Sequence, residues 1–262
     1  MARSLTPLVL AAAALFAGML AAPGATSSRA ATLMQPAAYL PPSPAALGRP
    51  VPGKPAAPKP ATRPAPLRYT LIDAAGASVR AWPGGRSMGT LAFTTPLGSH
   101  SWAWAVARSG RWAKIVLPWR PNGRYGWIRT TGRHTVQTAI WVDADLSRRT
   151  VTLMRGRARL RSFSAAIGAA ATPTPTGRFS VTDLVATGNA SGPFGWYAFG
   201  LSGHQPNLPV GWTGGDQLAI HGTNAPSTIG TAASAGCLRV SASALGVLKR
   251  SLRLGTPVII HP

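Results

Sequence analysis

Glutamate is absent from this chain of 262 residues, and the acidic residues number only five, all of them aspartates. Chemistry that needs paired glutamates is therefore excluded, and a metal site rich in carboxylates is not expected. Lysine and arginine together number 27, so that the formal net charge is +22. A positive charge this large favours polyanionic surroundings, which are either nucleic acid or the anionic polymers of a cell envelope.

The chain also lacks an apolar run long enough for a comfortable membrane span of about 20 residues. The run from Leu8 to Ala22 follows the basic Arg3 and precedes small residues. This order is typical of a secretory signal, so we expect residues 1–30 to be a signal peptide, with an uncleaved N-terminal membrane anchor as the alternative. The protein is therefore expected outside the cytoplasm, in the cell wall or periplasmic space, either secreted or tethered to the membrane.

Cysteine occurs once, at Cys237. An exported protein with one cysteine forms no intramolecular disulfide, and a free thiol outside the cytosol is prone to oxidation. The thiol therefore calls for a reason. One reason is structural, since cysteine packs as a small hydrophobic residue. The other is chemical, and the neighbouring residues decide between the two.

Composition changes twice along the chain. Residues 31–67 are rich in proline and alanine and predict an extended linker. From Arg68 onward, short β-type runs alternate with turns, and "RPNGRYG" indicates a hairpin because Asn-Gly suits the turn positions with positive φ. We expect residues 68–135 to form a small all-β, barrel-like module. Its many tryptophans either fill a small core or form a stacking surface, and the sequence leaves both open.

Residues 138–262 are expected to form a second, mostly β domain with one short helix. Strand-like runs are Ala139–Val142, Thr150–Met154, Ala158–Ala165, the segment around Phe179, "WYAFGLSG", "DQLAIH" and "PVIIHP". The helix is expected within "SASALGVLKRSLRLGTP", because Leu245, Leu248 and Leu252 fall on one face and Ser241 or Ser243 can cap its start.

His221 precedes Cys237 by sixteen residues and stands at the end of a predicted buried strand. A catalytic cysteine needs a base or a cation nearby, because the thiolate is the reactive form. The intervening loop is long enough to return the thiol to the imidazole. Gly236 lets the backbone turn sharply and aim amide groups at one point, as an oxyanion hole requires. Arg239 would lie on the same side as Cys237, where it could lower the thiol pKa or hold a substrate carboxylate.

A catalytic histidine also needs an acceptor for its second ring nitrogen. The carbonyl oxygen of Gly222 is the nearest candidate in the sequence, and the only acid nearby is Asp216. His204 lies in the loop "LSGHQPNLP", near the predicted cavity, and is expected to be an incidental polar residue that faces solvent.

The string from Ile220 to Val240, which contains "HGTN", "IG" and "SAGCLR" in that order, resembles the signature of the L,D-transpeptidase family, whose catalytic domain is also called YkuD-like. The upstream strings "TPTPTGRF" and "WYAFGLSG" are similar to further elements of the same family. The resemblance covers Thr138 to Pro262 and implies a β-sandwich-like fold with a cysteine nucleophile.

The resemblance also implies a reaction. The thiol would attack a peptidoglycan stem tetrapeptide before its terminal D-alanine, D-alanine would leave, and an amine of a neighbouring stem would resolve the thioester as a 3→3 cross-link. His221 would be the general base, oriented by the carbonyl of Gly222, and the amides of Gly236 and Cys237 would form the oxyanion hole. Substrate would be bound by Arg239, Tyr197 and Ser234.

Two features qualify the resemblance. Ala235 stands where many family members have a histidine, which is expected to alter the cavity or the choice of acceptor rather than the chemistry, since His221 matches the base. The module of residues 68–135 resembles bacterial SH3-type wall modules only loosely, through "LPWRPNG" and "GWI".

The alternatives are an exported cysteine peptidase, acting as an L,D-carboxypeptidase or endopeptidase, and a catalytically weak wall-binding protein. Papain-like peptidases place cysteine before histidine, which is the reverse of the order here. No cofactor is expected, and no metal site, because the spacings of zinc ligands are missing. The expected partners are stem peptides and anionic wall polymers. Nucleic acid is not expected, because an export signal is predicted and the sequence shows no recognised basic-aromatic reader.

Overall fold

The computed structural model describes residues 67–262, which belong to one compact unit, Ala65–Pro262. The predicted signal peptide and all but the last residue of the predicted linker lie outside the described residues. Among residues 67–262, no helix has the length and apolar character needed to cross a membrane.

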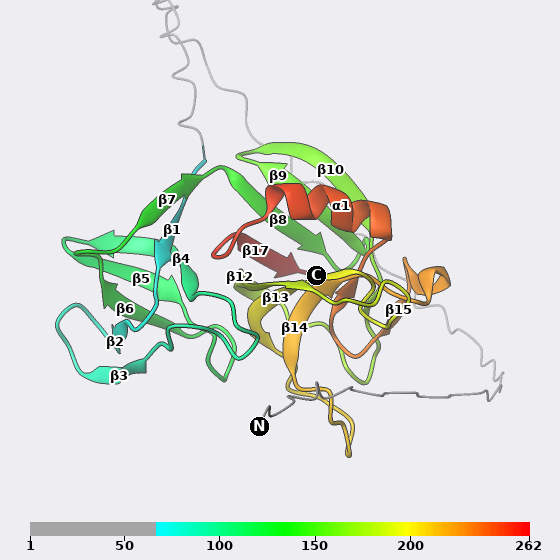
Figure 1. Cartoon of the computed structure of the whole chain (residues 1–262), viewed down its shortest axis with the longest axis horizontal. Helices are drawn as coiled ribbons and strands as arrows, with labels where there is room; N and C mark the ends of the chain where they lie inside the picture. Colours follow the sequence, from blue (N-terminus) through cyan, green and yellow to red (C-terminus); the bar gives the residue numbers. More distant parts are fainter. Residues whose placement is uncertain (1–66) are drawn as a thin grey trace, which may run out of the picture. The chain divides into compact units, whose positions relative to one another are not determined.

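The first part of the unit is an antiparallel sheet of seven strands, in the order β3-β2-β6-β5-β4-β1-β7. We call it the amino-terminal sheet (Figure 1). Its strands are β1 (Tyr69–Asp73), β2 (Ser78–Arg80), β3 (Ser87–Thr90), β4 (Trp102–Ser109), β5 (Trp112–Val116), β6 (Tyr125–Arg129) and β7 (Thr135–Thr138). The segment "RPNGRYG" forms the turn between β5 and β6, with Gly123 at φ 79°, as its Asn-Gly pair predicts.

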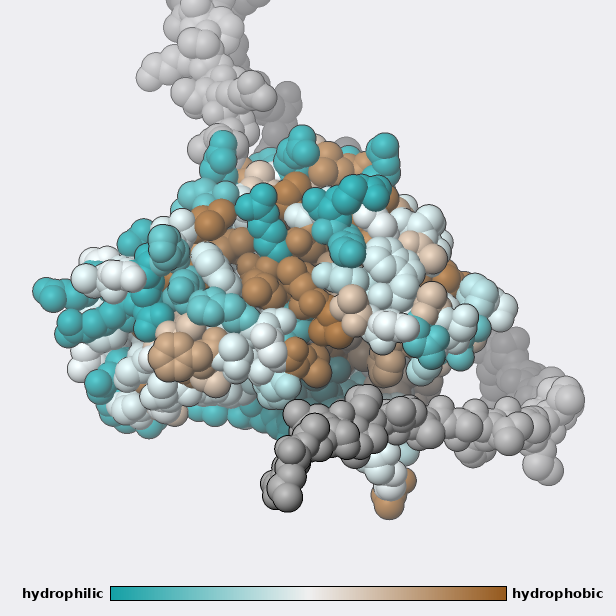
Figure 2. Space-filling model, in the orientation of Figure 1, coloured by the Kyte–Doolittle hydropathy of each residue, from teal (hydrophilic) through white to brown (hydrophobic). Residues whose placement is uncertain are grey.

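The core of the amino-terminal sheet consists mainly of small and branched side chains, among them Val79, Ile115 and Ile128. The tryptophans of this part of the chain differ in burial. Trp104 is buried, whereas Trp82 keeps 55% of its surface exposed. Hydrophilic side chains gather over the left of Figure 2, where the amino-terminal sheet lies.

The second part is an eight-stranded mixed sheet in the order β10-β9-β8-β17-β12-β13-β14-β16. Its strands are β8 (Ile140–Asp145), β9 (Thr150–Arg155), β10 (Ala158–Ser164), β12 (Gly177–Ala186), β13 (Tyr197–His204), β14 (Gln217–His221), β16 (Leu238–Arg239) and β17 (Pro257–His261). The β8–β17 and β14–β16 pairs are parallel. A separate parallel pair joins β11 (Ile167–Gly168) to β15 (Ala232–Ser234), and a 3₁₀ turn, η1, spans Pro226–Thr228.

The helix α1 (Ala242–Ser251) lies across one face of the mixed sheet (Figure 1). The hydroxyl of Ser241 caps it by accepting a hydrogen bond from the amide of Ala244 at 3.2 Å. Leu245 and Leu248 are fully buried and Leu252 nearly so, packed with Phe199 and other residues of the sheet. The predicted helix, its cap and its apolar face are therefore confirmed.

The prediction of a mainly β chain with one short helix is also confirmed. The second part is a curled, half-barrel-like sheet covered by α1 on one face. The sequence did not predict β7, β11, β15 and β16. These strands are only two to four residues long, which is too short to show a periodic pattern of apolar residues.

Candidate active site

His221 is the last residue of β14 and is almost fully buried. Its Nδ1 lies 2.6 Å from the carbonyl oxygen of Gly222, the acceptor named above. Because a carbonyl oxygen can only accept, Nδ1 carries the proton and donates it. This leaves Nε2 with a free lone pair. The ring of Phe194 packs edge-on against the imidazole, with centroids 4.9 Å apart.

Burial lowers the pKa of His221 to about 4, although the bond to Gly222 opposes the shift. The neighbouring Arg239 lowers it further. The imidazole is therefore neutral near pH 7. A neutral histidine with an available Nε2 is the form that a general base needs.

Cys237 precedes β16, which pairs with β14 in parallel register, Ile220 opposite Leu238 and His221 opposite Arg239. Paired residues of adjacent strands point to the same face, and side chains alternate along each strand. Leu238 and Ile220 point into the core. Cys237, Arg239 and His221 therefore share the opposite face, with Cys237 and His221 as diagonal neighbours.

The thiol of Cys237 is half-buried and in no disulfide. Its Sγ lies 3.9 Å from the carbonyl oxygen of Gln217. Burial raises the pKa of Cys237, and the backbone of Ala219 and the charge of Arg239 only partly offset the rise. At rest the pair is therefore a neutral thiol beside a neutral imidazole, and the proton must leave the sulfur when it attacks.

The loop before Cys237 is closed by the hydroxyl of Ser234. It donates to the carbonyl of Cys237 at 2.6 Å and accepts from the amide of Gly236 at 3.1 Å. The Gly236 amide is thus engaged inside the loop, whereas the Cys237 amide has no acceptor within residues 67–262. Of the two amides expected to form an oxyanion hole, only that of Cys237 is available in this structure.

The segment "TPTPTG" holds the same loop from the other side. Thr174 donates to the carbonyl of Gly236 at 2.8 Å and accepts from the amide of Gly168 at 2.8 Å. Thr172 donates to the carbonyl of Ser234 at 3.0 Å. Both hydroxyls are buried, so each of these bonds satisfies a backbone group that water does not reach.

Gln205 completes this support. Its side-chain amide contacts the carbonyls of Thr172, Pro173 and Ala235 at 2.9–3.3 Å. Gly236 has φ 117°, and a Cβ at this position would collide with the Gln205 amide. Glycine is therefore required here both by the backbone angle and by the close approach. Nothing in the local sequence marks Gln205, because its partners lie about thirty residues away.

Residues 139–260 match the family model of the L,D-transpeptidase catalytic domain, YkuD. They belong to that family. This match confirms the resemblance to the L,D-transpeptidase family. The resemblance rested on short, separated sequence strings around His221 and Cys237.

Two relatives each match just under half of the chain. YkuD of Bacillus subtilis (strain 168), itself named only provisionally as an L,D-transpeptidase, is 31% identical over 120 residues, which are 46% of this chain and 65% of that protein. Its counterpart in Bacillus licheniformis is 32% identical over 121 residues, with the same coverage. This chain thus spans just under two thirds of the length of these relatives.

Among solved structures, an L,D-transpeptidase from Mycobacterium smegmatis has 17% sequence identity and a TM-score of 0.39, over 60% of this chain and 81% of that one. At that TM-score the two chains differ too much overall for the likeness to add to the family match.

Arg239 is the residue of the L,D-transpeptidase domain whose positive charge acts on the thiol of Cys237. Its Nε is buried and has no hydrogen-bond partner among the described residues. Burial lowers the pKa of Arg239, and the nearby Cys237 opposes that shift. An unsatisfied guanidinium nitrogen beside the nucleophile is suited to a carboxylate of the substrate.

Tyr197 does not lie on the face of the L,D-transpeptidase domain that carries Cys237. Ala198 is opposite His221, so the adjacent Tyr197 points to the other face. There it is buried in the core with Phe199, and the ammonium of Lys249 on α1 lies 4.8 Å from its ring centroid. The predicted substrate-binding role does not fit this position. The same holds for Ser234, whose buried hydroxyl is committed within the loop.

His204 is not the free solvent-facing residue that the sequence predicted. Its backbone exchanges two hydrogen bonds with the side chain of Asn122, at 2.7 and 2.8 Å. Its ring nitrogens lie 3.1 Å from Asp216 and from the carbonyl of Pro118. The β5–β6 turn of the amino-terminal sheet is thus fastened to the end of β13, next to Gln205.

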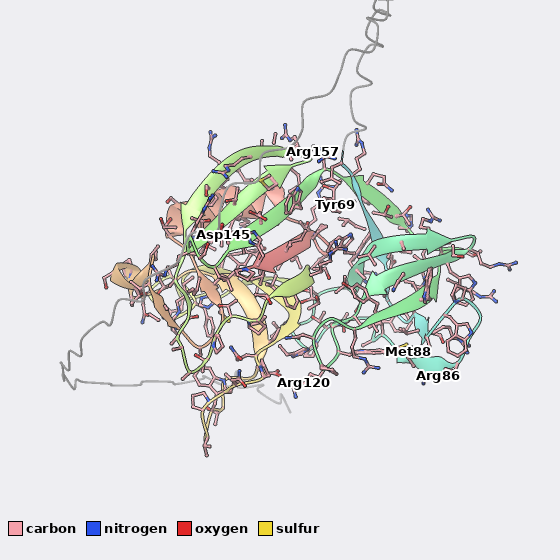
Figure 3. All side chains as sticks on the ribbon, turned by 180° about the vertical axis from the view of Figure 1, so that it is seen from behind. Tyr69, Arg86, Met88, Arg120, Asp145 and Arg157 are labelled. Carbon is pink, nitrogen blue, oxygen red and sulfur yellow. The ribbon has the colours of Figure 1, made fainter. Side chains whose placement is uncertain are left out.

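Two further contacts join the sheets at this end. Arg120, labelled in Figure 3, pairs with Asp216. The fully buried Asp183 accepts hydrogen bonds from Thr95 of the amino-terminal sheet and from the side chain of Gln217, the latter at 2.8 Å. Gln217 is the residue whose carbonyl faces Cys237. The amino-terminal sheet therefore supports the strand ends that position the site.

Proposed function

We propose that the protein is an exported peptidoglycan L,D-transpeptidase with Cys237 as its nucleophile. The observation that supports this best is the shared face of β14 and β16, on which a thiol, a neutral imidazole of defined tautomer and an unpaired guanidinium are neighbours. The donor would be a stem tetrapeptide, and the products D-alanine and a 3→3 cross-link. Stem peptides would thus be both donor and acceptor.

In the first half-reaction, Nε2 of His221 takes the thiol proton of Cys237 as the sulfur attacks the carbonyl carbon before the terminal D-alanine. The resulting oxyanion accepts a hydrogen bond from the amide of Cys237. When the intermediate collapses, the C–N bond breaks and the imidazolium returns the proton to the leaving amine. D-alanine departs and a thioester remains.

In the second half-reaction, the side-chain amine of a neighbouring stem attacks the thioester carbon. A C–N bond forms, the C–S bond breaks, and one proton passes from the amine through His221 to the sulfur, which restores the thiol. The Gly222 carbonyl orients the imidazole in both halves, and Arg239 holds a stem carboxylate. Ser234, Thr172, Thr174 and Gln205 keep the cysteine loop in place.

The place of action would be the cell wall, which agrees with the family and with the predicted export signal. The surplus of positive charge would hold the protein against anionic wall polymers. Such retention predicts that binding of the protein to isolated walls weakens as salt is raised, because salt screens exposed charges.

The test is mass spectrometry of the products formed by the full chain from a disaccharide-tetrapeptide. The expected product is a dimer lighter than two substrates by one D-alanine alone, absent with the Cys237→Ala variant. A tripeptide monomer without any dimer would mean that water is the acceptor, and would replace this proposal by a carboxypeptidase. Dimer formation by Cys237→Ala would remove the mechanism.

A further inference from the structure

The amino-terminal sheet carries a cavity of about 420 Å³ that plays no part in the chemistry above. It is lined by Ser78, Arg80, Gly84, Trp112, Arg129 and Arg133, and we call it the arginine pocket. Its walls come from β2, the loop between β2 and β3, β5, β6 and the loop after β6. Three arginine residues therefore line one concave site.

Each guanidinium of the arginine pocket is held by a neighbour. Arg80 donates to the carbonyl of Gly85 at 3.2 Å, and Arg133 donates to the carbonyls of Asp73 and Ala75 at 3.2 and 3.0 Å. Arg129 lies over the ring of Trp112, 5.3 Å from its centroid. These contacts fix the side chains and leave other N–H groups of each fork free for a ligand.

None of the three arginines of the arginine pocket forms an ion pair with a carboxylate among the described residues. All five aspartates of the chain lie within the described residues, and the side chain of each contacts other groups: Asp73 with His100, Asp143 with His261, Asp145 with Arg148, Asp183 with Gln217 and Asp216 with Arg120. Three like charges held together are mutually repulsive. An anion in the pocket would relieve that repulsion.

We propose that the arginine pocket binds a phosphate group of a phosphodiester-linked polyol or sugar polymer. Guanidinium forks match the oxygens of a phosphate in pairs, and a phosphodiester offers two free oxygens to the converging forks. A polymer is favoured over a free ion because Trp82 is exposed and its ring lies against Gly85, beside the pocket residue Gly84. That ring offers a flat surface to the unit next to the phosphate.

Several features leave the polymer room to approach. A Cβ built on Gly84 would meet no atom within 4 Å. The pocket lies on the amino-terminal sheet, over which hydrophilic side chains stand among neutral and some apolar ones (Figure 2). An apolar surface for insertion into lipid is not part of the lining, which makes a phosphate-bearing polymer a better fit than a membrane.

The test measures the binding of the full chain to poly(glycerol phosphate) by calorimetry, for the wild type and for Arg129→Gln. Arg129 is exposed and donates no hydrogen bond within the described residues, so its substitution should leave the fold intact. The matched control is Arg157→Gln, which removes the same charge from the β9–β10 turn of the mixed sheet (Figure 3). We expect Arg129→Gln to weaken binding about tenfold, the size of one charge-assisted bond, and the control to change it less than twofold.

Four outcomes decide the matter. The expected split between Arg129→Gln and Arg157→Gln supports the pocket. Equal weakening by both variants would mean that only net charge counts, and would overturn it. Inorganic phosphate binding as tightly as the polymer, at equal phosphate concentration, would overturn the polymer assignment. Phosphatidylglycerol vesicles bound through Arg129 in place of the polymer would overturn it in favour of a membrane.

The outcome of this polymer-binding test does not depend on the chemistry at Cys237. Release of D-alanine from a soluble disaccharide-tetrapeptide should be the same for the wild type and Arg129→Gln. A transpeptidase without a working arginine pocket and a binding protein without turnover are therefore distinguishable results.

Discussion

The two sheets of this protein differ in the charge state of their functional side chains. In the mixed sheet the reactive groups are kept neutral, since burial lowers the pKa of His221 and raises that of Cys237. In the amino-terminal sheet three guanidinium groups share one pocket without a carboxylate. The difference follows from solvation: burial disfavours the charged forms of His221 and Cys237, whereas water stabilises the charge of a group at the surface.

The positions of the few carboxylates show the same contrast between the two sheets. Two of the five aspartates, Asp183 and Asp216, lie where the sheets meet, and each accepts a hydrogen bond or ion pair from both sheets. They join the sheets instead of balancing surface arginines. The amino-terminal sheet thus supports the site from one end while its arginine pocket stays unbalanced.

The largest difference between the sheets should come from removing the nucleophile. Cys237→Ala is expected to reduce the release of D-alanine by about 10⁴-fold or more, because no other group can form the thioester. Arg129→Gln should retain full turnover with the soluble substrate. Turnover is followed by mass spectrometry, and circular dichroism checks the fold. If Cys237→Ala turned over substrate near the wild-type rate, the assignment of the chemistry to the mixed sheet would be wrong.

The pH dependence of kcat/KM tests whether His221 is held neutral. The base works unprotonated, and its pKa is lowered to about 4, so the acidic limb should fall near pH 4 instead of near 6.5. Below that limb the rate should drop about tenfold per pH unit. An acidic limb at pH 6.5 in folded protein would show that burial does not lower the pKa of His221.

The free energy of unfolding should also depend on pH through His221. Between pH 6.5 and 4 the unfolded chain binds a proton at His221 that the folded chain does not, so the free energy of unfolding should fall as the pH falls through this window. Urea unfolding at several pH values measures the effect. The His221→Gln variant, which cannot titrate at this position, is the control and should show a smaller decline.

Thr174→Val tests the support of the cysteine loop. The valine keeps the shape but leaves the carbonyl of Gly236 and the amide of Gly168 without their buried partner. We expect a loss of about 1–3 kcal/mol in stability together with reduced turnover. The control is Thr231→Val, whose hydroxyl bonds within an exposed turn and whose loss should cost less than about 0.5 kcal/mol. Equal effects of the two variants would contradict a supporting role for Thr174.

Asn122→Ala should have the smallest effect and tests the contact between the sheets. It removes both hydrogen bonds to the backbone of His204 and should lower stability by about 1–2 kcal/mol. Turnover should fall modestly, because Gln205, which contacts the cysteine loop, follows His204 directly. Asn189→Ala, in an exposed loop, is the control. Unchanged thermal unfolding of Asn122→Ala would mean that the Asn122–His204 contact does not hold the two sheets together.

The sequence by itself determined the mainly β character, the capped helix α1 and the family of residues 139–260. These depend on local periodicity, on a capping hydroxyl and on short strings, all of which are visible along the chain. The candidate pair of His221 and Cys237 was visible for the same reason, as was the Gly222 carbonyl, because an acceptor one residue away needs no tertiary information.

Only the tertiary structure decided which groups surround that pair. Register places Tyr197 on the far face and Arg239 on the near one, and a shift of one residue would reverse both. Gln205, Thr174, Asn122 and Asp183 act on partners between thirty and ninety residues away. The arginine pocket likewise unites residues of separate strands. Such contacts arise from the pairing of distant strands, which no local pattern of residues specifies.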